Sequence, residues 1–233
     1  MEDGKKKMNN VNVIYEDNHL LIVEKPVNIS VQQDSTNDKD LLTILKEYIK
    51  VKYNKPGNVY LGLVHRLDRP VGGIMIFAKT SKCASRLSEQ IRLGSIDKWY
   101  LAVVNGELKK QTDILEDYIL KDEKNNVTKI VKKDTTKSKY AKLEYNVLEY
   151  NKDENLSLVN IHLYTGRHHQ IRLQFNNIGH TLYGDQRYGK QDKKQIALWA
   201  YKIEFNHPIT NERIAFDLLP KKIGIWSKFS HIK

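Results

Sequence analysis

The chain has 233 residues and a mass of 27.2 kDa, and 39 Lys and Arg against 28 Asp and Glu give it a formal net charge of +11. Its 40% hydrophobic and 29% charged residues are typical of a globular protein and exclude a disordered or fibrous chain. No apolar run approaches the about 20 residues that a membrane-spanning helix needs. We therefore expect one large domain or two small ones that do not cross a membrane.

Cysteine usage and charge indicate the compartment and the kind of partner. The single cysteine, Cys83, cannot form an internal disulfide, so we expect a reducing, cytoplasmic environment. Residues 1–10 are charged and lack the apolar stretch of a secretory signal, which predicts a flexible basic tail. The excess positive charge favours nucleic acid or an anionic membrane surface as partner, although Lys-rich surfaces also arise for solubility alone.

Apolar patterning predicts the elements of the first half of the chain. Short runs between turn residues indicate strands, and leucines at helical spacing indicate amphipathic helices. The first helix has Asp38 or Asp40 as its N-cap, and the second ends at Gly94. The predicted elements are strands over 11–15, 19–26, 59–64 and 73–79, and helices over 38–52 and 80–93.

The second half reads mainly as strands. A helix of about three turns is expected within 165–179, because Ile171, Phe175 and Ile178 share one face and Gly179 ends it. Segment 109–138 is the most polar of the chain and is predicted to be a solvated excursion around a weak strand at 127–131. The other predicted strands cover 98–105, 141–147, 159–163, 197–205 and 214–218. We expect a mainly antiparallel sheet in one domain.

Several common active sites are excluded. The chain has no Gly-rich phosphate loop, no dinucleotide fingerprint and no GxSxG elbow, which argues against nucleotide hydrolysis, hydride transfer and α/β-hydrolase chemistry. The histidine cluster comprises His162, His168, His169 and His180. His168 and His169 would point about 100° apart on a helix and would not share one ion, so we expect no metal.

The turn His65-Arg66-Leu67-Asp68-Arg69-Pro70 is the most promising site. It places four ionisable residues between two strands that are predicted to be buried. Charge at the end of a core strand is costly unless it is used, and basic neighbours would keep a carboxylate such as Asp68 ionised. The alternative is an ion-paired structural turn.

Six motifs in order give the chain a family resemblance. They are HRLD (65–68), FAKT (77–80), KWYLAVVNG (98–106), TGRHHQIR (165–172), GH..YGD..YG (179–189) and His207-Pro208. Together they resemble the RluA-like pseudouridine synthases over about 11–220. The chain departs from the family after HRLD, where Arg69-Pro70-Val71 replaces a small polar pair before glycine. Many relatives also begin with an S4 RNA-binding domain, whereas only residues 1–10 precede the first predicted strand here, so we expect a stand-alone catalytic domain over 11–233.

The resemblance implies a fold, a reaction and a partner. The fold is α+β, with a long, mainly antiparallel, bent mixed sheet flanked by helices and an active-site cleft in the middle. The reaction isomerises specific uridines in rRNA or tRNA to pseudouridine, with no cofactor, no metal, no membrane and no obligate protein partner. The alternative is a non-catalytic RNA-binding protein that retains the synthase fold.

The same resemblance implies roles for individual residues. Asp68 matches the catalytic aspartate, Tyr100 the tyrosine that stacks on the target base, and Arg172 the arginine that pairs with the carboxylate. Asp68 would act as nucleophile or as base at the sugar, and the sequence leaves both open. The residues expected to contact RNA are His65, Arg66, Arg69, Lys98, Arg167, Gln170 and Arg187, with the Lys-rich stretch 132–142 as a further candidate.

Overall fold

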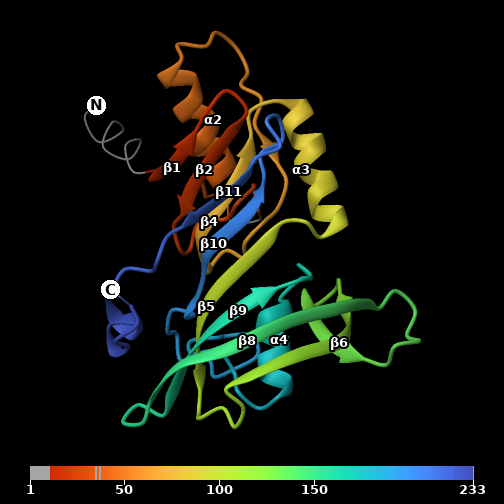
Figure 1. The fold of residues 1–233 in the computed structure, drawn as a ribbon, viewed down its shortest axis with the longest axis vertical. Helices are drawn as coiled ribbons and strands as arrows, with labels where there is room; N and C mark the ends of the chain where they lie inside the picture. Colours follow the sequence, from red (N-terminus) through yellow and green to blue (C-terminus); the bar gives the residue numbers. More distant parts are fainter. Residues whose placement is uncertain (1–10, 35, 37, 233) are drawn as a thin grey trace. The chain divides into compact units, whose positions relative to one another are not determined.

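The computed structural model describes residues 11–34, 36 and 38–232 (Figure 1). The chain forms two compact units, one made of the chain up to Ile96 with Lys202–Leu218, the other of Asp97–Tyr201 with Leu219–Lys233. Strand β10, Leu198–Asn206, contributes residues to both. The expected tail 1–10 lies outside the described residues, and a single catalytic domain over 11–233 stays a prediction. Every helix in the described ranges is too short or too polar to span a membrane.

The first unit is built on short antiparallel strands. β2 pairs with β1 on one side and with β4 on the other, β3 also pairs with β4, and residues 202–206 of β10 pair with β11. The strands are β1 Val13–Glu16, β2 Leu20–Lys25, β3 Gly62–Leu63, β4 Gly72–Ala78 and β11 Arg213–Asp217. The predicted strands here are confirmed except for 59–64, of which only Gly62 and Leu63 pair. Val59 and Leu61 are buried by packing without a ladder, so the apolar run indicated burial and not a strand.

Two capped helices flank this sheet, as Figure 1 shows. Helix α2, Leu41–Lys52, begins after Asp40, whose side chain accepts the Thr43 N–H. Helix α3, Ser81–Leu93, begins after Thr80, whose hydroxyl accepts the Cys83 N–H, and ends at Gly94 with φ of +69°. Both caps satisfy N–H groups that would otherwise lack a partner, so the sequence-based helix boundaries are close to the observed ones.

The core of the first unit lies on both faces of β2 and β4. Alternate residues from the two strands pack with Cys83 and Leu87 of α3, and they are Leu20, Ile22, Ile74 and Ile76. The residues between them are buried as well, and they are Leu21, Val23, Met75 and Phe77. Strands covered on both faces read as continuous apolar runs, which is why the sequence showed no alternation here.

The second unit contains one antiparallel sheet in the order β5-β9-β8-β6-β7. Its strands are β5 Asp97–Asn105, β6 Thr112–Asp122, β7 Val127–Val131, β8 Lys139–Asn151 and β9 Leu156–Leu163. The prediction for 109–138 is wrong in one respect, because β6 is an 11-residue strand paired along its length with β8. Only Leu115 and Ile119 of β6 are buried, and the charged residues between them hid the strand in the sequence.

Helix α4, Gln170–Asn177, is shorter than expected. It starts only after His169, which has a left-handed backbone with φ of 53° that ends the preceding loop. His168 and His169 are therefore in the loop and stack with ring centroids 3.7 Å apart, instead of diverging by 100° on a helix. A 3-10 helix, η1 Gly224–Lys228, precedes Phe229 and Ile232, which pack into the core of the second unit.

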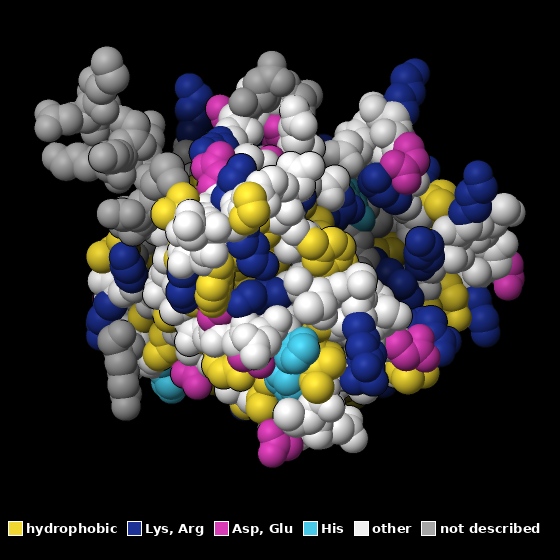
Figure 2. Space-filling view, turned by 90° about the horizontal axis from the view of Figure 1, so that it is seen from above, with side chains coloured by type: hydrophobic (Ala, Val, Ile, Leu, Met, Phe, Trp, Pro, Cys, Tyr) yellow, Lys and Arg dark blue, Asp and Glu magenta, His cyan; other side chains and the backbone are white. Residues whose placement is uncertain are grey.

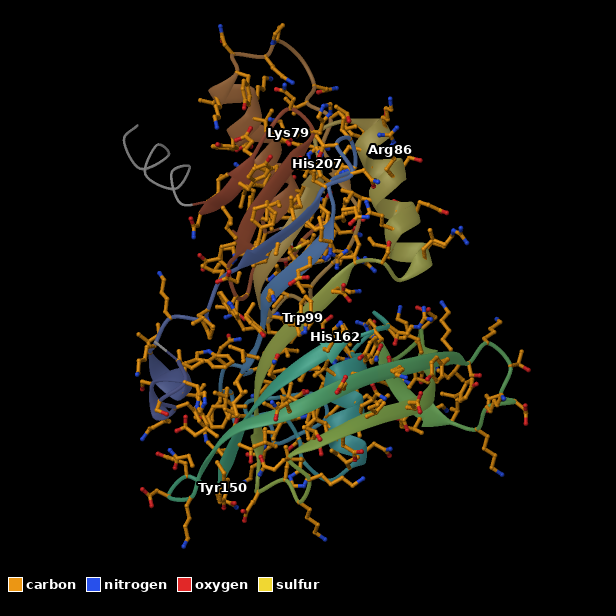
Figure 3. All side chains as sticks on the ribbon, in the orientation of Figure 1. Lys79, Arg86, Trp99, Tyr150, His162 and His207 are labelled. Carbon is orange, nitrogen blue, oxygen red and sulfur yellow. The ribbon has the colours of Figure 1, made fainter. Side chains whose placement is uncertain are left out.

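A buried carboxylate ties α2 to the sheet of the first unit. Glu16 on β1 accepts hydrogen bonds from Tyr48 and Lys52 on one oxygen and from Tyr53 and Lys79 on the other (Lys79 is labelled in Figure 3). Burial alone would raise the pKa of Glu16, but the donors, with Lys52 and Lys79 foremost, outweigh it and lower the pKa to about 2.

Replacing this carboxylate should destabilise the protein in a pH-dependent way. Because the folded pKa lies below the ordinary 4.5, the stabilisation is complete above pH 4.5 and is lost as the pH falls towards 2. Glu16→Gln should lower the free energy of unfolding by roughly 3 kcal/mol at neutral pH, and this difference from wild type should shrink between pH 4.5 and 2. Urea denaturation measures both, with exposed Glu89→Gln as a near-neutral control.

Candidate active site

Asp68 lies in the middle of the loop 64–71, which connects β3 to β4. The loop is held from both sides, since His65 Nε2 accepts the Ile76 N–H at 3.0 Å and the Val71 N–H binds the Asp68 carbonyl at 3.0 Å. Asp68 is half-buried, and Arg66 is exposed. The first unit thus presents a carboxylate on a fixed turn at the start of a fully buried strand.

Lys25, which no sequence motif indicated, supports this turn. Its side chain is fully buried, and Nζ donates to the carbonyls of Pro26 at 2.9 Å, Arg69 at 2.9 Å and Val71 at 2.7 Å. Burial lowers the pKa of Lys25 to about 7, while the negative charge of Asp68 opposes that shift. A charged residue that closes an apolar strand, just before Pro26, was the signal available in the sequence.

Arg69, expected to contact RNA, has local acidic partners. Its guanidinium donates to the Asp34 carboxylate at 3.2 Å, to the Thr36 hydroxyl at 2.7 Å and to the Asp38 carboxylate. Its charge is therefore balanced within the loop that precedes α2, and its backbone carbonyl is one of the three that bind Lys25.

Tyr100 lies on β5 in the second unit and is 8% exposed. It is opposite Ile161 of β9, which is itself opposite Tyr145 of β8. Directly opposed residues share a sheet face, and the Tyr145 ring packs 5.4 Å from the ring of Phe175 in α4. Tyr100 therefore faces the side of the sheet that α4 covers.

Arg172 of α4 is buried and bonded to a second residue that the sequence analysis missed. Its Nε and Nη2 donate to the two Asp185 oxygens at 2.8 and 2.7 Å, and its guanidinium carbon is 5.6 Å from the centre of the Tyr188 ring. Asp185 also accepts the Arg187 and Tyr188 N–H groups. Burial would raise the pKa of Asp185, but Arg172 and the two backbone N–H groups together outweigh it and the pKa is lowered. The YGD..YG motif thus holds Arg172 in one orientation.

The loop before α4 is fixed by Gln170. Its side-chain oxygen accepts the Thr165 hydroxyl at 2.8 Å and the Arg167 N–H at 3.1 Å, and its amide nitrogen donates to Gln174 at 3.0 Å. Gln170 is buried, and these contacts support the loop; its contact with RNA stays a prediction. Arg187 is exposed and donates to the carbonyls of the turn at 125–126.

The predicted site residues divide between the two units. His65, Arg66, Asp68 and Arg69 belong to the first, and Lys98, Tyr100, Arg167, Gln170, Arg172 and Arg187 to the second. The pairing of Arg172 with Asp68 stays a prediction, whereas its bond to Asp185 is established. No group of His, Cys, Asp and Glu among the described residues is arranged to hold a metal ion.

Lys25 should give the protein a distinctive stability profile at alkaline pH. Its folded pKa of about 7 lies below its ordinary 10.5, so the unfolded chain binds more protons between these values and stability rises with pH there. Relative to Lys25→Met, wild type should gain up to about 1.4 kcal/mol of unfolding free energy per pH unit over this range. Urea denaturation at several pH values measures the slope, and parallel profiles would contradict an ammonium group buried at this turn.

Asp185→Asn should destabilise the protein strongly, because it removes the buried negative charge to which the Arg172 Nε and Nη2 groups donate. We expect a loss of about 3 kcal/mol in the free energy of unfolding. The exposed carboxylate Asp153, replaced by Asn, is the matched control and should change stability little. Equal effects of the two substitutions would argue against the buried pair.

The chain resembles known proteins in sequence and in fold. The model of the RNA pseudouridylate synthase family matches residues 19–177. An RNA pseudouridine synthase of Helicobacter pylori is 32% identical over 219 residues, which cover 88% of this chain and 65% of the relative. The ribosomal large subunit pseudouridine synthase D of Zymomonas mobilis is also 32% identical, over 88% of this chain and 68% of its own length. The chain thus spans about two thirds of the length of these relatives.

Solved structures agree with this result at the level of the fold. Human RNA pseudouridylate synthase domain containing 4 matches with a TM-score of 0.78 and 18% identity, over 96% of this chain and 92% of that one. Human RNA pseudouridylate synthase domain containing 1 matches with a TM-score of 0.73 and 21% identity, over 92% and 85%. The expected α+β synthase fold is confirmed. The family match extends over Asp68, Tyr100 and Arg172, and the chain belongs to the RNA pseudouridylate synthase family.

Proposed function

We propose that this protein isomerises specific uridines in RNA to pseudouridine, with Asp68 as the essential carboxylate. The observation that carries the proposal is the family match over 19–177, which includes the loop of Asp68, the strand of Tyr100 and the helix of Arg172. The support of the Asp68 turn by a buried lysine is consistent with it, because a reacting group must be held in one geometry.

The reaction suits this set of side chains. The N1–C1′ glycosidic bond breaks, the uracil turns while it stays enclosed, and a C5–C1′ bond forms as the C5 proton leaves and N1 regains one. No electrons are exchanged with a second reactant, so a carboxylate with acid-base partners is sufficient. Asp68 acts at the sugar as nucleophile or as base, and Tyr100 stacks on the base, which contributes about 1 to 3 kcal/mol.

RNA is the partner that best accounts for the charge of the chain. Lys and Arg outnumber Asp and Glu by 39 to 28, and on the face shown in Figure 2 basic side chains predominate over acidic ones. The relatives named for the ribosomal large subunit favour rRNA over tRNA as the substrate. The target uridine must leave its stack to meet a half-buried carboxylate, and phosphate contacts offset that cost. A cytoplasmic location and the absence of an obligate protein partner belong to this proposal.

Asp68→Asn should abolish catalysis and leave RNA binding almost intact. The substitution removes the charge and keeps the size of the side chain, so tritium release from RNA labelled at uracil C5 should fall roughly 10³-fold or more. Exposed Asp217→Asn in β11 makes the same change of charge in the same unit and should retain full activity.

The same assay separates the enzyme from a non-catalytic RNA-binding protein with this fold. An enzyme releases tritium in the wild type and loses it in Asp68→Asn. Binding of RNA without release in either protein would instead support the binding protein, and release that survives in Asp68→Asn would remove Asp68 from the mechanism. Mapping pseudouridines in rRNA and tRNA from cells that lack the gene would then identify the modified position.

A further inference from the structure

Two cations lie close together in the second unit. Lys98 is on β5 and Arg167 is in the loop before α4, next to Gly166, and a Cβ atom on Gly166 would lie 3.5 Å from Lys98 Nζ. Lys98 is partly buried. Burial, and then the charge of Arg167, lower the pKa of Lys98. Both effects disfavour the charged form of the Lys98 side chain in the folded protein.

Neither cation has an acidic partner in the part of the chain that the structure describes. The side chain of Arg167 makes one hydrogen bond, from Nε to the Tyr140 carbonyl at 3.0 Å, which leaves both terminal nitrogens available. Asp97 attracts Lys98, but this attraction is weaker than the repulsion from Arg167.

Asp97 is directed instead towards the neighbouring strand. Its Oδ1 is 3.0 Å from His162 Nε2, and the His162 ring stacks on Trp99 at 4.7 Å between centroids (Figure 3). Among the described residues, the positive charge of Lys98 and Arg167 is therefore compensated only in part, by Asp97. Such a pair costs stability in the free protein and is expected where a ligand supplies the missing negative charge.

The backbone around the pair is fixed before any ligand arrives. Gln170 holds the Thr165 hydroxyl and the Arg167 N–H, and the Thr165 N–H binds the Lys142 carbonyl at 3.2 Å. Gly166 is exposed and carries no side chain, so it leaves the approach to Lys98 open. A group with several negatively charged oxygens would bind the guanidinium fork and the ammonium together.

We propose that Lys98, Gly166 and Arg167 form a binding site for one backbone phosphate of the RNA substrate. This inference rests on the proposed function in that it takes RNA as the partner. It goes beyond a general basic surface, because it assigns one phosphate to Lys98 and Arg167. It also explains why the protein holds these two cations close together although their repulsion lowers stability.

Lys98→Gln tests the site through two effects of opposite sign. Removing a partly compensated charge beside Arg167 should raise the melting temperature, whereas loss of the phosphate contact should weaken RNA binding roughly tenfold at low salt. The slope of log binding constant against log salt should become shallower by about 0.7, the value for one phosphate on a single strand. Exposed Lys109→Gln is the control with the same change of charge, and it should alter neither property to this extent.

RNA with single methylphosphonate linkages shows whether one phosphate is involved. One position should weaken binding to the wild type as much as Lys98→Gln does and should cause no further loss in the variant. Equal effects at every position, an unchanged salt slope, or a lower melting temperature for Lys98→Gln would overturn the site. These outcomes are distinct from failure of the proposed function, which is measured as absent tritium release; absence of RNA binding would remove both the partner and the site.

Discussion

The hydrogen bonds of the buried Lys25 side chain are the interactions on which the candidate site depends most. The loop of Asp68 leads into the apolar, fully buried strand β4, so it needs a support that fixes its backbone. Lys25 meets this need, because one side chain binds the carbonyls of Arg69 and Val71 on either side of Pro70. The Lys25 pKa is lowered by burial, and the negative charge of Asp68 opposes that shift, so the two groups are close enough to interact. A single buried residue therefore fixes the turn that carries Asp68.

In the second unit, the Asp185 carboxylate fixes the orientation of Arg172. Asp185 is itself held by two backbone N–H groups, so it orients the guanidinium without needing to be oriented by it. The Tyr188 ring covers the guanidinium, and the Tyr188 hydroxyl accepts the Thr128 N–H from β7. In the first unit a buried lysine bound to backbone carbonyls supports the group expected to react, and in the second unit a buried ion pair does so. Both kinds of contact are costly to break.

The sequence predicted elements whose signal is local and missed those whose signal is not. Helix α3 was found at both ends, because the Thr80 cap and Gly94 act within a few residues. Strand β6 was missed, since its burial against Ala141 and Leu173 is decided by distant residues. Asp68, Tyr100 and Arg172 were identified from motifs, whereas Lys25 and Asp185 act through carbonyls or a guanidinium that only folding brings near. Such contacts produce no periodic pattern of apolar residues in the sequence.

The division of the chain has a consequence for its synthesis. The first unit needs Lys202–Leu218, which the ribosome makes after nearly all of the second unit, and Phe229 and Ile232 then return to the second. Neither unit is thus one continuous stretch, and cutting the chain near Ile96 would leave the earlier piece without β11 and part of β10. We expect the sheet of the first unit to stay incomplete until translation is almost over, and the two units to complete folding at the same time.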